Sequence, residues 1–393
     1  MAGPLSHIRV LDMTRVLAGP WTGQNLADLG ADVIKIERPG KGDDSRAFAP
    51  PYIKDEQGNE TKESAYFCCA NRGKRSVTVD ISKPEGAQLV RELAANVDVL
   101  LENYKFGDLT RYGLGYEQLK EVNPRLVYCS ITGFGQTGPD REKPGYDFMI
   151  QGMGGIMSVT GQPDGVPGAE PMKIGVAFAD IFTGLYCTIG IQAALYHRER
   201  TGEGQQIDIS LLDTQIACLA NQAMNWLVGG VDPGRLGNRH PTVVPYKTFD
   251  VADGTIIIAI GNDGQFRAFC TLMGVPQLAQ DARFVTASAR LINRDAIEAE
   301  VQRLVANEPG LPLIDRLAAA GVPAGPVNKV SEVFADPFIT ARNVVHDFVR
   351  ADGAHIPSVA FPGKLSATPA TMRRPPPRVG EDEISVIADW LDR

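Results

Sequence analysis

The chain has 393 residues, which is more than one ordinary hydrophobic core accommodates and therefore predicts two domains. Its net charge of −8 argues against general nucleic-acid binding, and no apolar stretch reaches the roughly 20 residues that a membrane span needs. The opening segment "MAGPLSHIRVLDM" lacks the basic and apolar regions of a secretory signal, so we expect a cytoplasmic protein with no membrane partner.

The first two hundred residues predict strands that alternate with helices. Helical patterns lie between most of the strands, and a long apolar helix is expected at about 181–199. This alternation is typical of an α/β protein whose mostly parallel sheet is covered on both faces. The predicted strands are 7–13, 31–38, 76–81, 98–103, 126–132 and 205–210.

The composition changes after residue 225. The segment "GGVDPGRLGNRHPTVVPY" is rich in glycine and proline and predicts a linker or a site loop. The next segment, "YKTFDVADGTIIIAIG", predicts a hairpin with Asp253 and Gly254 at its turn. We therefore predict a large α/β domain over 1–225, a smaller α/β domain over 226–325, and a carboxyl-terminal linker over 326–393 that returns to the large domain.

The sequence offers little support for a tightly bound cofactor. Glu37 at the end of the second predicted strand suggests a nicotinamide dehydrogenase, but the glycine fingerprint G-x-G-x-x-G is missing. The first strand is followed by "DMTRVLAGPWTG" instead, so a dehydrogenase is a disfavoured alternative. The six cysteines form no C-x-x-C pair and no metal pattern with the five histidines, and no metal site is expected.

The segment "IGVAFADIFTG" places a single acid, Asp180, among apolar and glycine residues. Because a long helix follows, Asp180 is expected at the amino-terminal cap or in the first turn, where the helix end favours the ionised carboxylate. Capping alone explains an aspartate in this position, and so does a role in chemistry. The local pattern favours the cap, although both roles are compatible.

Two early loops carry clusters of basic residues after predicted strands. Such side chains suit phosphate oxygens, although charged turns usually lie in solvent. Both loops follow strands of one sheet, and open α/β sheets bind ligands at the carboxyl ends of their strands. The clusters comprise Arg38, Lys41 and Arg46 in the first loop, and Arg72, Lys74 and Arg75 in the second.

Several segments resemble, in order, the motifs of the family III CoA-transferases, and the resemblance spans nearly the whole chain. It implies a Rossmann-like large domain and a smaller α/β domain that form an open ring, with two rings interlocked as a homodimer. It also implies coenzyme A or acyl-CoA as a substrate. The segments include "VLDMTRVLAGPWTGQNLADLGADVIKIERPGKGDDSR", "NRGKRSVTVDI", "GYDFMIQGMGG", "ADIFTGLYCTIGIQAAL" and "GVPAGPVNKVSEVFADP".

The resemblance assigns the nucleophile to Asp180. The carboxylate attacks an acyl-CoA thioester to form a mixed anhydride, and CoA then returns to give an aspartyl-CoA thioester. It also assigns contacts with CoA, although Leu17 replaces a glutamine of formyl-CoA transferases, so a polar contact there is not expected. The implied CoA contacts are Val16, Arg38, Arg72, Lys74, Arg75, Asn103, Tyr104 and Arg111.

The same family contains α-methylacyl-CoA racemases, which use a histidine in the motif "GYDFMIQG". This chain has Tyr146 there, and an ordinary tyrosine is a poor base at neutral pH, so transfer is favoured over racemisation. The motifs look closest to members that use succinyl-CoA and dicarboxylates such as glutarate. The candidate substrate contacts are Tyr146, Arg239, His240, Gly261 and Asn262.

Overall fold

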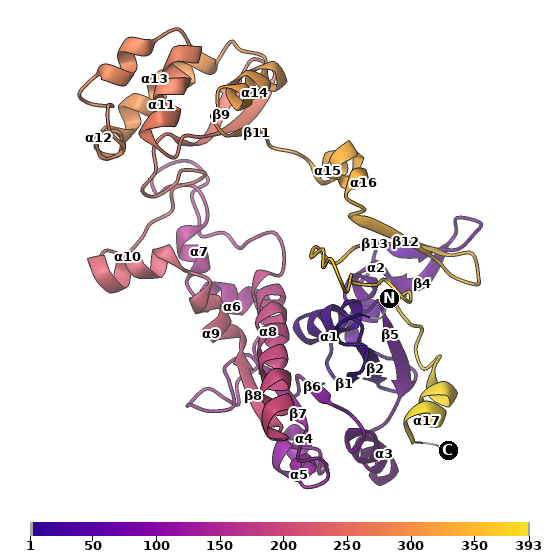
Figure 1. Ribbon diagram of the computed structural model, residues 1–393. Helices are drawn as coiled ribbons and strands as arrows, with labels where there is room; N and C mark the ends of the chain where they lie inside the picture. The colour runs from indigo at the N-terminus through magenta and orange to yellow at the C-terminus, as the bar shows by residue number, and fades with distance from the viewer. Residues whose placement is uncertain (1–2, 392–393) are drawn as a thin grey trace. The chain divides into compact units, whose positions relative to one another are not determined.

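The computed structural model describes residues 3–391, which form two compact units (Figure 1). The first unit comprises Met1–Met157, Lys173–Val231 and Phe338–Arg393, and the second comprises Ser158–Met172 and Asp232–Pro337. The carboxyl-terminal part therefore groups with the amino-terminal part. Residues 158–172 group with the second unit, although the sequence placed them in the large domain.

The first unit is built on a six-stranded parallel sheet with the order β5-β2-β1-β6-β7-β8. Counted along this sheet alone, the order is that of a Rossmann fold, and it reverses direction between β1 and β6. The predicted α/β class and the six predicted strands are confirmed. The strands are β1 (Arg9–Asp12), β2 (Asp32–Glu37), β5 (Lys74–Thr78), β6 (Val99–Glu102), β7 (Val127–Thr132) and β8 (Gln205–Ser210).

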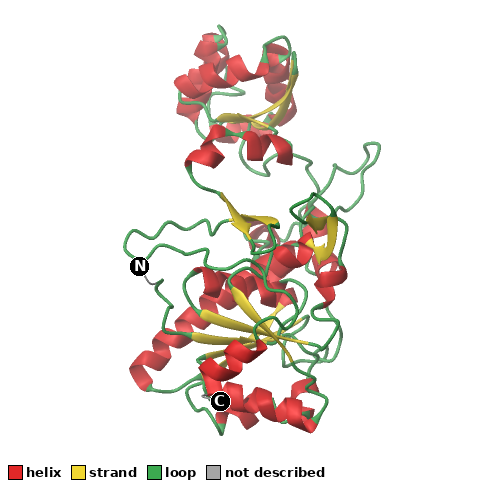
Figure 2. Cartoon of the chain, turned by 90° about the vertical axis from the view of Figure 1, so that its right-hand side faces the viewer, coloured by secondary structure: helices red, strands yellow, loops and turns green. Residues whose placement is uncertain are grey.

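Helices cover both faces of this sheet, as Figure 2 shows. Successive strand residues point to opposite faces, so Val10 packs with α1 (Ala18–Asp28) and α8 (Phe178–Thr201). The next residue, Leu11, packs on the other face with α3 (Pro84–Ala94) and the carboxyl-terminal helix α17 (Glu383–Leu391). Burial on both faces explains why β6, for example, is apolar from Val99 to Leu101 without alternation.

The helix α8 is a central packing element of the first unit. Its Cys187, Ile191 and Ala194 are buried against the sheet, and it packs beside α1. By length and composition alone it could cross a membrane, which corrects the expectation that no apolar stretch is long enough. Core packing in the first unit accounts for much of its apolar character.

The remaining elements of the first unit are short helices and two hairpins. One antiparallel pair joins β3 (Tyr52–Lys54) to β4 (Glu60–Ser64), and another joins β12 (Val345–Val349) to β13 (His355–Val359). The short helices of this unit and of the unit boundaries are η1 (Asp44–Ala47), α2 (Ala65–Cys68), α4 (Asp108–Arg111), α5 (Tyr116–Lys120), α6 (Asp147–Met153), α7 (Ile156–Val159), α9 (Leu211–Ala217), α10 (Asn221–Gly229) and α16 (Pro337–Ala341).

The second unit has its own core around a three-stranded antiparallel sheet, β11-β10-β9. The predicted hairpin is confirmed as β9 (Tyr246–Val251) and β10 (Gly254–Ala259), and β11 (Ala324–Pro326) pairs with β10. Phe249, Phe266 and Phe269 are fully buried in this core. The helices are α11 (Asp263–Leu272), η2 (Pro276–Gln280), α12 (Ala287–Ile292), α13 (Arg294–Val305), α14 (Gly310–Ala319) and α15 (Val330–Ala335).

Candidate active site

A pocket of about 210 Å³ lies where the strand order of the parallel sheet reverses. Its walls are the chain after β1, the chain after β6, and the end of β7, which is where an open α/β sheet binds ligands. Asp180 in the first turn of α8 reaches the same pocket. The other lining residues include Arg15, Val16, Leu17, Ala18, Asp44, Asn103, Tyr104, Lys105, Phe106, Arg141, Lys143, Tyr146 and Asp147.

Asp180 occupies the first turn of α8, as the sequence predicted. The residue before this helix, Ala177, supplies no side-chain cap. Among residues 3–391, no side chain donates a hydrogen bond to the Asp180 carboxylate, and no cation pairs with it. The carboxylate is therefore available for chemistry, and the simple reading of Asp180 as a helix cap is not supported.

The ionisation of Asp180 differs from the prediction. The helix end was expected to keep the carboxylate charged, but burial and the nearby charge of Asp147 raise the pKa of Asp180 to about 7. Burial and the Asp180 charge also raise the pKa of Tyr66 to about 12. Loss of water and a like charge thus outweigh the helix dipole, whose effect is modest at a helix end.

Asp147 links two helices at the base of the pocket. Its Oδ1 accepts a hydrogen bond from the backbone N–H of Asp180 at 3.2 Å, and its Oδ2 accepts one from Gln151 Nε2 at 2.7 Å. Gln151 is fully buried, and its Oε1 accepts from the backbone N–H of Ile174 at 2.9 Å. Asp147 and Gln151 therefore hold the chain that leads into α8.

The loop after β1 is clamped in an unusual conformation. Asn103 Oδ1 accepts from the backbone N–H of Arg15 at 2.9 Å, and Asn103 Nδ2 donates to the Arg15 carbonyl at 2.8 Å. The following residue, Val16, has a φ of 71°, which a β-branched residue rarely adopts. Its N–H donates to Asp43 Oδ1 at 3.1 Å. These contacts stabilise the strained wall of the pocket.

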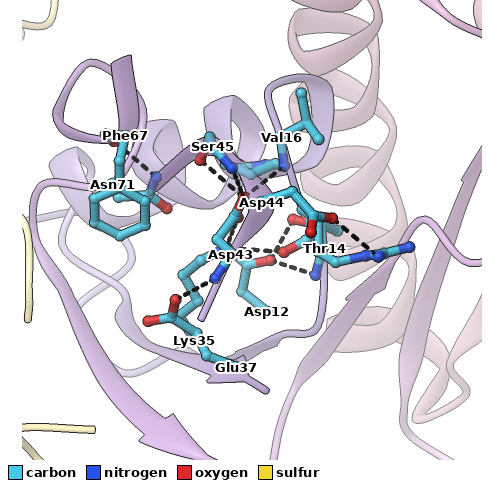
Figure 3. Close-up of polar contacts among 12 residues, drawn as sticks. Asp12, Thr14, Val16, Lys35, Glu37, Asp43, Asp44, Ser45, Phe67 and Asn71 are labelled. Carbon is cyan, nitrogen blue, oxygen red and sulfur yellow. Dashed lines mark hydrogen bonds and ion pairs between the residues drawn. The ribbon is translucent and has the colours of Figure 1, made fainter. Parts of the chain in front are cut away.

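A buried ion pair supports this loop from inside the domain, and Figure 3 shows its contacts. Lys35 Nζ lies 2.8 Å from Asp43 Oδ2, both side chains are inaccessible to solvent, and Lys35 also donates to the Thr14 carbonyl at 2.8 Å. Burial alone would raise the pKa of Asp43, but the Lys35 ammonium outweighs it and holds this pKa well below its usual range. Asp43 is therefore a fixed anion that orients the Val16 N–H.

The pocket brings together the predicted nucleophile, Asp180, with four of the predicted contacts to CoA or substrate: Val16, Asn103, Tyr104 and Tyr146. Asn103 uses its side chain on the Arg15 backbone, and the Arg15 guanidinium stacks over the Tyr104 ring at 5.3 Å. Tyr146 is 73% exposed, which excludes ordinary core packing for its side chain.

Two other predicted CoA contacts do not line this pocket. The Arg38 guanidinium is half exposed and pairs with Asp44, which itself lines the pocket. Arg111 lies at the end of α4, largely exposed, and pairs with Asp108. Their assignments to CoA stay predictions.

The three basic residues of the second predicted phosphate loop are buried instead of facing the pocket. Arg72 pairs with Asp28, Lys74 pairs with Asp12, and Arg75 pairs with Asp32 and Asp389. The exposed fractions of the three residues are only 5%, 1% and 4%. Each charge thus already has a carboxylate partner within the domain, and the assignment of these three residues to CoA stays a prediction.

The remaining predicted substrate residues lie in the second unit, where each has a local partner. Arg239 pairs with Glu298 at 2.8 Å, and His240 Nδ1 accepts from the backbone N–H of Val243 at 3.0 Å. The Gly261 N–H donates to Gln265 Oε1 at 2.7 Å, and the Asn262 side chain caps α11. Their contacts with a substrate stay predictions.

Sequence reasoning missed Asp147 and the cations at the pocket. Asp147 follows Tyr146 directly in "GYDFMIQG", so the motif drew attention to the neighbouring residue. Lys105 and Arg141 line the pocket, and neither has an ion-pair partner among the described residues. The same part of the chain, residues 3–391, contains no cluster of three or more metal-ligating side chains.

The reversed strand order, the pocket and the buried carboxylate together define an α/β enzyme of the Rossmann type. The model of CoA-transferase family III matches residues 5–383, and the chain belongs to this family. It is therefore a CoA-transferase, as the sequence motifs predicted.

Three relatives show the range of similar proteins. Succinate–glutarate CoA-transferase of Agrobacterium fabrum is 50% identical over 98% of this chain and 95% of that protein. Succinyl-CoA:glutarate CoA-transferase of Mus musculus is 39% identical over 99% of this chain and 86% of that protein. Acetyl-CoA:oxalate CoA-transferase of Acetobacter aceti is 40% identical over 95% and 92%.

A solved structure confirms the fold. The crystal structure of a CAIB/BAIF family protein from Brucella suis matches with a TM-score of 0.86 and 50% identity. The match covers 99% of this chain and all of that chain. The Rossmann-like architecture is thus supported independently of the sequence pattern.

Proposed function

We propose that this enzyme transfers CoA from a dicarboxylyl-CoA donor, such as succinyl-CoA, to a dicarboxylic acid such as glutarate. The carrying observation is the 50% identity, over 98% of the chain, to a protein named succinate–glutarate CoA-transferase. The pocket supports an anionic substrate, because Lys105 and Arg141 line it without carboxylate partners among residues 3–391. None of the three relatives described above is named as a racemase, and Tyr146 replaces the racemase histidine.

The reaction runs through Asp180. Its carboxylate oxygen attacks the thioester carbonyl, the C–S bond breaks, and CoA leaves as a thiolate, so a mixed anhydride forms. The thiolate then attacks the aspartyl carbonyl, which releases the donor as a free carboxylate and leaves an aspartyl-CoA thioester. The acceptor carboxylate repeats the two steps in reverse order. No proton needs to be transferred, because every leaving group is an anion.

The apolar and partly closed surroundings of Asp180 suit this chemistry. An anhydride is hydrolysed by water, so the site must limit access to the acyl group. Ala179 beside the nucleophile is fully buried, and the rings of Phe178 and Phe182 pack with centroids 4.3 Å apart. The same burial raises the pKa of Asp180, so only the ionised fraction attacks at neutral pH.

We also propose that the enzyme is a cytoplasmic homodimer that takes CoA only as a substrate. Support for association comes from large apolar side chains that the first unit leaves exposed on α8 and α10. Exposed apolar surface of this kind usually marks a protein interface. These side chains are Leu185, Tyr186, Ile189 and Tyr196 on α8, and Met224, Trp226, Leu227 and Val228 on α10.

The decisive experiment combines a substrate panel with trapping of the intermediate. Purified enzyme is incubated with succinyl-CoA and a series of mono- and dicarboxylates, and new CoA thioesters are identified by mass spectrometry. Hydroxylamine added during turnover should leave a hydroxamate on the peptide that contains Asp180. Asp180→Ala should abolish transfer while circular dichroism stays unchanged, and unchanged turnover by this variant would refute the mechanism.

A further inference from the structure

We propose that Asp147 is a positioning residue for the nucleophile: it docks the first turn of α8 and holds a second negative charge against Asp180. This inference rests on the proposed role of Asp180 as the nucleophile. Acylation removes the charge of Asp180, so the repulsion between the two carboxylates exists before attack and disappears in the covalent intermediates. Asp147 would thus favour attack without touching the substrate acyl group.

The docking contact replaces a missing helix cap. The first backbone N–H groups of α8 have no acceptor within the helix, and Ala177 at the cap position has no side chain that can accept them. The Phe178 N–H donates to the Val176 carbonyl at 2.8 Å instead. The carboxylate of Asp147 comes from the start of α6 and accepts the N–H of Asp180 itself at 3.2 Å. The position of the nucleophile is therefore fixed through its own backbone, by a residue 33 positions earlier.

The orientation of Asp147 is fixed in turn by Gln151. The Gln151 amide is fully buried, donates to Asp147 Oδ2 at 2.7 Å and accepts from the Ile174 N–H at 2.9 Å. Gln151 Nε2 also donates to the Val176 carbonyl at 3.4 Å. A buried side chain with three backbone or carboxylate partners cannot rotate freely, so both oxygens of Asp147 keep their directions.

Docking of α8 does not by itself require the negative charge of Asp147. A neutral amide oxygen could accept the same N–H, and two neighbouring carboxylates repel each other. No cation pairs with Asp147 among the residues that the structure describes, and Gln151 Nε2 is a neutral donor. Capping of α8 needs only a hydrogen-bond acceptor, so it does not explain why residue 147 is an aspartate next to the carboxylate of Asp180.

The other ionisable groups around Asp180 do not cancel this repulsion. Tyr66 of α2 stays neutral because its pKa is raised to about 12. The pocket wall after β1 contributes Arg15, which pairs with Asp44 at 3.1 Å, and the wall after β6 contributes Tyr104 and Lys105. The remaining charged or titratable groups of the lining are Arg141, Glu142, Lys143 and Tyr146. Apart from burial, Asp147 is the group that raises the pKa of Asp180.

The test compares Asp147→Asn with Asp147→Glu. The first removes the charge but keeps an oxygen for the Asp180 N–H, and the second keeps the charge. In a plot of kcat/KM against pH, the fall on the acid side (the acid limb) reports the ionisation of the free enzyme. For Asp147→Asn we expect this limb to move to lower pH by about one unit, the usual effect of losing a nearby charge. For Asp147→Glu the limb should stay close to that of the wild type.

The rate on the alkaline plateau gives the second readout. In Asp147→Asn the carboxylate of Asp180 is more stable and less reactive, so kcat should fall by up to about tenfold, the factor that corresponds to one pKa unit. KM for acyl-CoA should change little, because Asp147 acts through Asp180. An acid limb that does not move in Asp147→Asn would overturn the inference and leave Asp147 as a helix cap.

Two controls separate this inference from the proposed function and from misfolding. A wild-type enzyme that gives no hydroxamate at Asp180 contradicts the nucleophile, whereas a normal hydroxamate with an unmoved acid limb contradicts only the role of Asp147. If Asp147→Asn does not fold, Asp147→Ser removes the charge with a smaller side chain whose hydroxyl oxygen can accept a hydrogen bond. Its acid limb should also move to lower pH, and no movement would overturn the inference.

Discussion

Lys74 Nζ lies 2.8 Å from Asp12 Oδ2, and neither side chain is accessible to solvent. Lys74 also donates to the Pro20 carbonyl and to Asn71 Oδ1, at 2.8 and 2.9 Å. Burial lowers the pKa of Lys74 to about 8, although the Asp12 charge opposes this shift. The pair joins β1 to β5 and α1, so a residue that the sequence suggested for phosphate binding holds together the elements that carry the pocket.

Removal of one partner of this pair should destabilise the protein strongly. Lys74→Met leaves the Asp12 carboxylate buried without its cation, which typically costs about 3–5 kcal/mol in the free energy of unfolding. The double variant Asp12→Asn/Lys74→Met removes both charges and should recover most of the loss. Urea denaturation of the three proteins checks this, and an equally unstable double variant would contradict the ion-pair explanation.

The clamp on the loop after β1 should affect substrate binding more than stability. Asn103→Ala removes both hydrogen bonds to Arg15, so the wall formed by Arg15 and Val16 loosens and KM for acyl-CoA should rise by about tenfold, equivalent to 1.4 kcal/mol. Steady-state kinetics with succinyl-CoA measures this change.

A matched control exists elsewhere in the same unit. Asn123 donates to the carbonyls of Ala94 and Val97 at 3.0 and 2.8 Å, and it does not line the pocket. Asn123→Ala should lower the melting temperature as Asn103→Ala does but leave KM unchanged. An equal rise of KM in both variants would show that general loosening, not the clamp, controls binding.

Much of the first unit could be predicted from the sequence because its signals are local. Buried parallel strands such as 126–132 are continuously apolar, and Asp180 precedes a long helix, so the strands and the first-turn position followed from short segments. The partners of charged side chains could not be predicted, because they depend on which strands become neighbours. Arg72 and Asp28 lie 44 residues apart in sequence, and only the packing of α1 beside β5 brings them together.

The ionisation of Asp180 could not be predicted for the same reason. The local pattern shows a helix end, which favours the charged form, but the opposing charge of Asp147 comes from another helix. The family resemblance supplied the role of nucleophile, which neither periodicity nor composition contains. Physical reasoning from the sequence thus located the residue, and the three-dimensional surroundings reversed the expected direction of its pKa.

The raised pKa of Asp180 should make the wild-type protein less stable at alkaline pH. The folded state binds this proton more tightly than the unfolded state, whose pKa is near 3.8, so the free energy of unfolding falls as pH rises from about 4 to 7. Asp180→Asn lacks this loss and should be more stable than the wild type at pH 8.5, by about 4 kcal/mol at most.

Thermal unfolding at several pH values measures this difference. The gap in melting temperature between Asp180→Asn and the wild type should shrink as pH is lowered from 7 towards 4, because the unfolded Asp180 then approaches its own pKa near 3.8 while the folded Asp180 is already protonated. Asp315→Asn serves as the control, because Asp315 is exposed and does not line the pocket, and its gap should not widen above pH 7. A gap for Asp180→Asn that is independent of pH would contradict the raised pKa.

The cations at the pocket, rather than the buried cluster of Arg72, Lys74 and Arg75, should determine affinity for CoA. Arg141 and Lys105 line the pocket without carboxylate partners among the described residues, and a charge-assisted hydrogen bond is worth about 1.5–3 kcal/mol. Arg141→Ala and Lys105→Ala should each raise KM about tenfold for every CoA donor, and the effect should weaken at high salt because exposed charges are screened.

Arg111→Ala provides the comparison that decides between the two assignments. Arg111 was predicted to contact CoA, but its side chain is largely exposed, pairs with Asp108 and does not line the pocket. Its substitution should therefore change KM much less than Arg141→Ala, when both variants are measured with the same donor at low and high salt. A larger effect of Arg111→Ala would support the assignment made from the family motif and would place the CoA phosphates closer to α4 than the pocket implies.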